Sequence, residues 1–398
     1  MNGIIERPDG RTMAASRWQI AMLWTVVWLG GSDPTLLGQR SDPVSSEPPT
    51  IRPNVLMIAV DDLRPMLGCY GDKTIATPHI DALAERGMRF DRAYCQFAKC
   101  GPSRLSILMG RRPDSIGVFS HRDEDMRAFR DAHADWFSLP RWFKAQGYHT
   151  RSFGKVHHDG WDDPRDWSVP SEPGREGEMM EIVDETAVTK LPFEERAGVP
   201  TVIADRLKCP AIQSPDVPDE TLFDGRMTSG AIAALKERKA AGEPFFLAVG
   251  YRRPHLPFVA PKAWFDRYPI DPAWLAPAAQ RQPPRGAPIM AWFNSDGYVG
   301  SARKQGLKLP DPPESVEEGM QWAGYELRSY VGLPNQGYLD DSAQLSVQQA
   351  YRACVSYVDA QIGRLLDGLG SLGLEKNTIV VLWSDHGWHL GEQGTWSK

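Results

Sequence analysis

The stretch Asn54-Val55-Leu56-Met57-Ile58-Ala59-Val60-Asp61-Asp62 indicates the fold class of this chain. Six apolar residues follow one another without the alternation that a half-exposed strand would show. Such a run is typical of a strand buried on both faces, as in a parallel sheet covered by helices. The two carboxylates come directly after it, where open α/β sheets place their binding sites. We therefore expect an α/β fold with a site at this strand end.

Two later apolar runs have the same form. The run at 244–249 leads within a few residues to His255, and the run at 377–383 leads to Asp385 and His386. Because the carboxyl ends of parallel strands meet at one edge of a sheet, we expect these polar residues to converge with the first two carboxylates.

Helical patterns separate the apolar runs, as in an α/β fold with a mixed, mostly parallel sheet flanked by helices. The region 256–340 is rich in Pro, Gly and Trp, and we expect it to be mostly loop. The first expected helix begins at Thr77-Pro78 and has Met88 on its apolar face. Further helices are expected at 102–109, 139–146 and 225–239, and a long amphipathic helix is expected from Val347 to Leu369. A further strand is expected at 148–153.

Composition excludes one class of partner. The chain has 398 residues with 45 basic and 51 acidic side chains, a formal net charge of −6. Nucleic-acid-binding domains usually carry a basic field, so we expect no nucleic-acid partner.

The N-terminus has the order of an export signal. Arg11 and Arg17 precede an apolar stretch at 18–31 that is short for a membrane span. We interpret 1–31 as a signal peptide and 32–52 as a disordered linker, with 53–398 as the catalytic domain. An uncleaved anchor or a buried helix remains the alternative. We expect export to the periplasm or the cell exterior, or to the lysosome in a eukaryote, with no membrane insertion beyond the signal.

A metal site is expected among the carboxylates. Asp61, Asp62 and Asp385 would repel one another at close range unless a cation lay among them. Oxygen ligands favour hard ions, so Ca²⁺ is expected and Mg²⁺ is possible on the same grounds. Taken alone, the pair Asp61-Asp62 fits a loop turn equally well.

A candidate nucleophile lies in Cys100-Gly101-Pro102-Ser103-Arg104. We expect Cys100 to come just before a helix with Pro102 at its first position, where free N–H groups lower a thiol pKa and attract anions. A buried structural cysteine is the alternative. The five cysteines include at least one without a disulfide partner, and the sequence leaves the pairing open, including that of Cys209.

These residues carry a resemblance to a known family. Residues 100–104 together with Leu108-Met109-Gly110-Arg111-Arg112-Pro113 are similar to the signature of sulfatases, which have an alkaline-phosphatase-like fold. In order along the chain, five segments resemble the iduronate-2-sulfatase-like branch of that family, and the resemblance covers about 53–398. The segments are 54–72, 100–114, 154–158, 244–257 and 381–398.

The resemblance implies a sulfuric ester hydrolase. A maturase would oxidise Cys100 to Cα-formylglycine, whose hydrated form attacks the sulfur of a sulfate ester and later expels sulfate. The implied metal ligands are Asp61, Asp62, Cys100, Asp385 and His386. The implied catalytic residues begin with Cys100 and with Arg104, which would lie beside the diol. Lys155 and Lys398 would bind the sulfate oxygens, and His255 would be the general acid. His158, rather than its neighbour His157, would be a partner of the diol.

Two features depart from the family pattern. His386 stands where many sulfatases have Asn, although the iduronate-2-sulfatase-like branch shares the Asp-His pair. Family members also continue beyond the position of Lys398 with a small C-terminal subdomain, so we expect this chain to be a truncated catalytic domain with activity that the truncation could impair.

The substrate is expected to be a sulfated sugar, with the glycosaminoglycans implied by the resemblance and algal polysaccharides as an alternative. Two other functions remain open. A metal phosphohydrolase of the same superfamily would share the carboxylates, but it would use Ser or Thr as its nucleophile. The second alternative is a non-catalytic relic of such an enzyme that binds sulfated glycans without hydrolysing them.

Overall fold

The computed structural model describes 52–172, 210–275, 286, 288, 314–321, 325–328, 330, 332–333 and 338–398. Contacts divide the chain into a unit at 1–50 and a unit at 51–398. The expected signal peptide at 1–31, nearly all of the linker at 32–52, and Cys209 lie outside the described residues. The fold below is that of the second unit.

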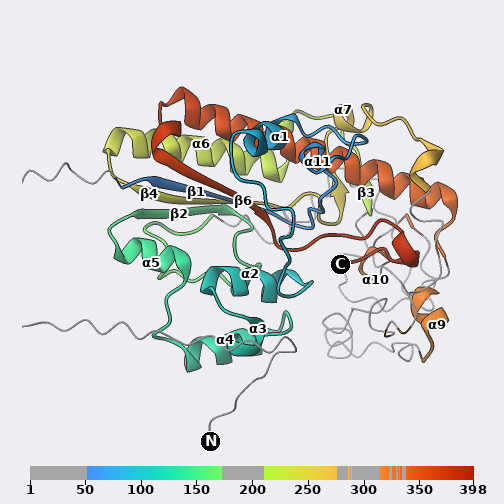
Figure 1. The fold of residues 1–398 in the computed structure, drawn as a ribbon, viewed down its shortest axis with the longest axis horizontal. Helices are drawn as coiled ribbons and strands as arrows, with labels where there is room; N and C mark the ends of the chain where they lie inside the picture. The colour runs from blue at the N-terminus through green and yellow to red at the C-terminus, as the bar shows by residue number, and fades with distance from the viewer. Residues whose placement is uncertain are drawn as a thin grey trace, which may run out of the picture. The chain divides into compact units, whose positions relative to one another are not determined.

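A four-stranded parallel sheet in the order β2-β4-β1-β6 forms the centre (Figure 1). Within the register, Val60 pairs with Tyr251 on one side and with Ser384 on the other, so the three strand ends meet at one edge. The three predicted strands that end in polar residues are therefore confirmed as parallel neighbours. Their bounds and those of the outer strand are β1 Asn54–Val60, β2 His149–Gly154, β4 Phe245–Tyr251 and β6 Thr378–Ser384.

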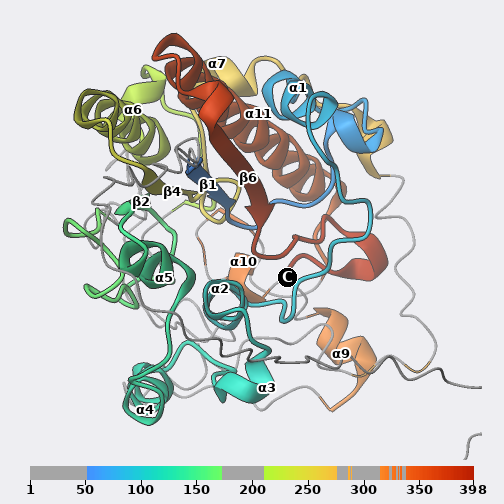
Figure 2. The same cartoon turned by 60° about the vertical axis from the view of Figure 1, so that its left-hand side comes forward.

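Helices cover both faces of the sheet (Figures 1 and 2). Every residue of β1 is buried: Leu56 and Ile58 pack toward the face that carries α6 and α11, while Val55 and Met57 pack toward the other. This explains why the run has no polar alternation. The helices on the first face are α1 Pro78–Glu85, α6 Phe223–Ala241 and α11 Asp341–Ser371, and those on the second are α2 Cys100–Met109 and α5 Leu139–Ala145.

Shorter elements complete the described part of the chain, including pieces of the region that was expected to be mostly loop. None of the described helices has the length and apolarity needed to cross a bilayer. Helix α4, Asp123–Ala132, has ten residues. The shorter elements are α3 Pro113–Ile116, α7 Lys262–Phe265, α9 Val316–Gln321, α10 Tyr325–Arg328, and the strands β3 Ile212–Gln213 and β5 Phe258–Val259, which pair in parallel.

Strand β6 differs from the expectation of burial on both faces. Ile379 is 52% exposed and Val381 is 43% exposed, whereas Val380 and Leu382 pack against the core. The reason is position, because β6 is the edge strand of the described sheet and helices cover it on one side. Met88 is a second correction: α1 ends at Glu85, and Met88 lies beyond it with 80% of its surface exposed.

Helix α2 begins two residues earlier than expected. Lys99 is its extended N-cap, and Cys100 is its first residue, so Pro102 occupies the third position rather than the first. Proline is tolerated there because the first amides of a helix have no partner inside the helix. Cys100 is thereby part of the helix itself and is buried against the sheet edge.

Candidate active site

The carboxylates at the ends of β1 and β6 meet as expected. Asp61, Asp62 and Asp385 are fully buried, and the backbone N–H of Asp62 donates to Asp385 Oδ1 over 3.2 Å. Asp62 has φ 60, a left-handed conformation that is uncommon for a residue with a side chain. The turn after β1 is thus bent so that its second carboxylate also faces the site.

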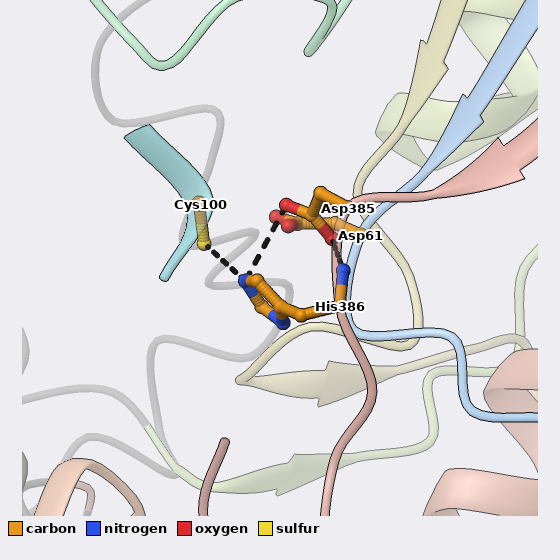
Figure 3. A group of neighbouring side chains, drawn as sticks. All are labelled: Asp61, Cys100, Asp385 and His386. Atoms are coloured by element: carbon orange, nitrogen blue, oxygen red, sulfur yellow. Dashed lines mark hydrogen bonds and ion pairs between the residues drawn. The ribbon is translucent and has the colours of Figure 1, made fainter. Parts of the chain in front are cut away.

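The sulfur of Cys100 faces these carboxylates from α2 (Figure 3). His386 Nε2 lies 3.3 Å from Cys100 Sγ and 3.5 Å from Asp385 Oδ2. His386 Nδ1 lies 3.1 Å from Asp62 Oδ1. The imidazole therefore bridges the nucleophile position and two of the carboxylates.

Arg104 links the helix to both strand ends. Its Nε donates to Asp385 Oδ2 over 2.9 Å, and its Nη2 lies 3.1 Å from Asp61 Oδ1. Its Nη1 donates to the backbone carbonyls of Lys155 and Val156. The guanidinium is fully buried, so it acts as a fixed support for the carboxylates rather than as a mobile surface charge.

Two lysines that are far apart in the sequence approach the carboxylates. Lys155, just after β2, pairs with Asp61 Oδ2, and Lys398 Nζ lies 3.3 Å from Asp62 Oδ1. Both are nearly buried, with side-chain exposures of 3% and 6%. A pair of desolvated ammonium groups beside a nucleophile is suited to holding an oxyanion.

His255 comes from the loop after β4. Its Nδ1 lies 2.6 Å from the carbonyl of Leu256, so this nitrogen carries a proton and Nε2 faces the site. His255 Nε2 lies 3.9 Å from Asp62 Oδ2 and 3.4 Å from Glu326 Oε1. Burial, together with the positive charge of Lys398, lowers the pKa of His255 to about 4.

The side chains of the two neighbouring histidines after β2 lie in different environments. His157 lies 3.2 Å from Asp166 Oδ2 in a buried pair, while the ring of His158 stacks on His121 with centroids 4.0 Å apart. No hydrogen bond joins His158 to Cys100 among the described residues. His157 is thus engaged by Asp166, whereas His158 stacks on His121, the residue that bonds to Gly101 in the first turn of α2.

Charge balance in the cluster depends on the cations. Burial alone would raise the pKa of Asp61, but Lys155 and Arg104 hold it well below its usual value. Burial would lower the pKa of His386, but Asp385 and Cys100 hold it well above its usual value. Neighbouring cations thus hold the pKa values of Asp61 and Asp62 below their usual range, whereas burial and the charge of Asp61 raise the pKa of Asp385 despite its pair with Arg104.

Possible metal ligands form two overlapping groups. Asp61, Cys100, Asp385 and His386 offer ligand atoms within 4.8 Å of one another, and Asp62, Cys100 and His255 form the second group. All five expected metal ligands are therefore present in the cluster. Cys100 is common to both groups.

Two residues at the site have no motif in the sequence. Glu326, on the short helix α10, contacts His255 and also Lys398 Nζ at 3.1 Å. His121, which was given no role from the sequence, accepts a 3.1 Å hydrogen bond from the N–H of Gly101 in the first turn of α2. Both reach the site through tertiary contacts, so spacing along the chain could not identify them.

The chain is similar to known proteins over most of its length. The sulfatase family model matches residues 53–398. The chain belongs to the sulfatase family. This confirms the family resemblance that was predicted for about 53–398.

Relatives of this sulfatase include well-defined enzymes. Human iduronate 2-sulfatase is 37% identical over 353 residues, which cover 87% of this chain and 56% of the human protein. A sulfatase of Formosa agariphila is 34% identical over 356 residues, covering 87% of this chain and 61% of the relative. The chain thus spans rather more than half the length of these relatives.

Solved structures agree on the fold. A phosphonate monoester hydrolase of Agrobacterium radiobacter has a TM-score of 0.54 at 19% identity, covering 87% of this chain and 65% of its own. A protein solved in complex with its substrate D-glucosamine-2-N,6-O-disulfate has a TM-score of 0.53 at 21% identity, covering 87% and 68%. At these identities the likeness supports the alkaline-phosphatase-like architecture alone.

Proposed function

We propose that this sulfatase hydrolyses the sulfate ester of a sulfated sugar, in the manner of an iduronate 2-sulfatase. The observation that carries the proposal is the position of Cys100, whose sulfur lies 3.3 Å from His386 at the first turn of a helix. Buried Lys155 and Lys398 lie on the same carboxylate cluster. Together they place two positive groups that could hold an anion beside a modifiable nucleophile.

Cys100 is proposed to be converted to Cα-formylglycine by a maturase. Its sulfur then marks the place of the oxygens that the hydrated aldehyde would carry. The hydrate would supply one hydroxyl to attack sulfur and a second to expel sulfate without attack by water on the enzyme. Because Cys100 is the first residue of α2, these oxygens would lie at the positive end of the helix.

The cluster fits one divalent cation. Asp61 Oδ1 is buried and accepts no hydrogen bond within the described residues, although Arg104 Nη2 faces it as an ion pair. The oxygens of Asp61, Asp62 and Asp385 suit Ca²⁺, or Mg²⁺ with closer geometry, and His386 would complete the set. The ion would supply polarisation of the sulfate and nucleophile oxygens.

The remaining residues have distinct proposed tasks. Lys155 and Lys398 would turn from the carboxylates to the sulfate oxygens, where their charge stabilises the developing negative charge. Arg104 would keep Asp61 and Asp385 in position. His255 would protonate the leaving sugar oxygen only as an imidazolium, with Nδ1 bonded to Leu256 and a second proton on Nε2 beside the carboxylates of Glu326 and Asp62. Bound sulfate would favour that second proton, because it compensates the charge of Lys398 that helps to lower the pKa of His255.

The relatives support a substrate class for this proposal, and the N-terminal sequence supports a location. A sulfated saccharide is the proposed substrate and a formylglycine-generating maturase the proposed partner, with no nucleic-acid partner. The human relative is named iduronate 2-sulfatase, which favours a glycosaminoglycan over other sulfated sugars. We propose export to the periplasm or exterior, or to a lysosome, directed by 1–31.

The test is co-expression with a formylglycine-generating maturase, followed by mass analysis of the peptide that contains Cys100. Turnover of p-nitrophenyl sulfate in the presence of Ca²⁺ or Mg²⁺ is then compared with that of p-nitrophenyl phosphate, with Cys100→Ala as the control. The proposal expects an aldehyde at position 100 and sulfate release that the variant lacks. A modified protein that binds sulfated saccharides without turnover would support a binding relic, and preferential phosphate release would support a phosphohydrolase.

A further inference from the structure

The first turn of α2 lacks the usual local cap. Lys99 is the N-cap and its side chain accepts no hydrogen bond from the helix, whereas Ser, Thr, Asp or Asn would do so at that position. The amide of Gly101 instead donates to Nε2 of His121 over 3.1 Å. A distant side chain therefore takes the place of a cap in the turn that carries Cys100.

The hydrogen bond specifies the state of the His121 ring. A backbone N–H can only donate, so Nε2 of His121 must be the bare nitrogen and the proton of the neutral ring must be on Nδ1. Burial and the neighbouring His158 both lower the pKa of His121 well below its usual value, in agreement with a neutral ring.

The same ring supports His158. Their planes are 14° apart with centroids at 4.0 Å, and Trp161 packs its edge against both rings, at 6.3 Å from His121 and 5.1 Å from His158. His158 Nδ1 is buried and has no hydrogen-bond partner in the described part of the chain. Packing between His121 and Trp161, rather than a hydrogen bond to Nδ1, thus sets the orientation of His158.

The close approach requires glycine at position 101. A Cβ on Gly101 would lie 2.8 Å from the His121 ring and 2.8 Å from the Trp161 ring. Both rings are therefore seated directly against the backbone of α2, with no space for a side chain between them. Cys100 is the adjacent residue.

We propose that His121 is a positioning residue of the sulfatase site. It holds the first turn of α2 through the Gly101 N–H and presents the ring of His158 beside the nucleophile. This inference rests on the proposed function for its effect on turnover. The contact itself is independent of turnover, which allows the two to be tested separately.

Three variants separate the two tasks of His121. His121→Gln keeps an acceptor for Gly101 without the ring, His121→Phe keeps a flat ring without the acceptor, and His121→Ala lacks both. His133 provides the matched control, because it also stacks on a tryptophan, Trp136, at 3.8 Å, but among the described residues its side chain forms no hydrogen bond with α2. His133→Ala should leave turnover within about twofold of the unmodified chain.

The expected result is a fall in kcat with little change in KM. His121→Ala should lose roughly tenfold or more in kcat, and Gln and Phe should each recover part of it. All proteins are compared at equal formylglycine content, measured by mass. Equal kcat in His121→Ala and His133→Ala, or a loss confined to KM, would overturn the proposal.

A spectroscopic readout covers the case of a chain without turnover. Nitrogen-15 NMR of labelled histidines at neutral pH should show a bare Nε2 and a protonated Nδ1 for His121, and the His158 signals should move in His121→Phe and His121→Ala. A protonated Nε2 in His121, or His158 signals unchanged in His121→Ala, would refute the positioning role even if sulfate hydrolysis proved absent.

Discussion

The hydroxyl of Tyr351 on α11 donates a 2.8 Å hydrogen bond to the backbone carbonyl of Asp62. The same hydroxyl accepts a 3.0 Å bond from the N–H of Arg64. A fully buried side chain of the long helix thus holds both sides of the turn in which Asp62 adopts its left-handed conformation. The long helix is therefore part of the support for the carboxylates that we propose as metal ligands.

Tyr351→Phe is expected to weaken metal binding. The change leaves a buried carbonyl and a buried N–H without partners, which costs about 1–3 kcal/mol of stability, and it frees the turn that carries Asp62. Calorimetric titration with Ca²⁺ should show a several-fold weaker affinity.

Tyr357→Phe is the matched control for this prediction. The Tyr357 hydroxyl also joins two backbone groups, accepting from Gly225 N–H at 2.9 Å and donating to the Asp219 carbonyl at 3.1 Å. The Tyr357→Phe variant should lose about as much stability as Tyr351→Phe and should keep the Ca²⁺ affinity of the unmodified chain. Equal losses of affinity in both variants would show that general destabilisation, not the turn, is responsible.

Asp385→Asn is expected to abolish stabilisation by Ca²⁺. The variant removes one anion from a cluster that also holds buried Arg104 and His386, so it should lose about 3–5 kcal/mol without metal. Thermal unfolding with and without Ca²⁺ measures both effects. Asp166→Asn, which breaks the buried pair with His157 elsewhere, should lose stability yet retain the shift in Tm on adding Ca²⁺.

Much of this architecture follows from local sequence. The runs before Asp61 and His255 are buried strands because both of their faces are apolar, and parallel pairing then brings their ends together. The run at 377–383 is also apolar, but Ile379 and Val381 are exposed because β6 is the edge strand of the described sheet. An apolar run alone does not reveal whether its strand lies at such an edge.

The residues that support the site were harder to predict from the sequence. The signature around Cys100 predicted the nucleophile together with Arg104, because their spacing is local to one helix. His121 and Glu326 lie in segments without periodic pattern and reach the site only through the folded chain. The start of α2 was misplaced because proline is compatible with several positions of a first turn.

Glu326→Gln is expected to strengthen the binding of inorganic sulfate. The carboxylate of Glu326 lies 3.1 Å from Lys398 and 3.4 Å from His255. At this position its negative charge repels a bound anion, and it pairs with Lys398, which is proposed to hold the sulfate. Removing this charge should gain about 1 kcal/mol, roughly fivefold in affinity. Inhibition of p-nitrophenyl sulfate turnover by sulfate gives the constant.

Glu392→Gln is the matched control for Glu326→Gln. Glu392 pairs with Arg64 at 2.7 Å and lies on the same C-terminal segment as Lys398, so a general effect of charge would appear in both variants. Sulfate binding that stays unchanged or weakens in Glu326→Gln would contradict a repulsive role for this carboxylate.

Asp359 is expected to make stability fall as pH rises. Its carboxylate, buried in α11, accepts bonds from His79 N–H and Ile80 N–H at the start of α1, at 3.2 Å and 2.8 Å. Burial raises its pKa to about 6, more than these N–H groups lower it. A pKa raised on folding favours the protonated form, so the contribution is fully present below about pH 4 and is lost as the pH rises through 6.

Urea unfolding of the unmodified chain and of Asp359→Asn between about pH 4 and pH 7 measures this contribution. The stability of the unmodified chain relative to the variant should decrease by up to about 3 kcal/mol over this interval, because Asn cannot ionise. Asp340→Asn, at the exposed N-cap of α11, is the control because no buried charge is removed there. A difference that is constant with pH, or that grows, would mean that Asp359 stays ionised in the folded chain and that its two N–H partners outweigh burial.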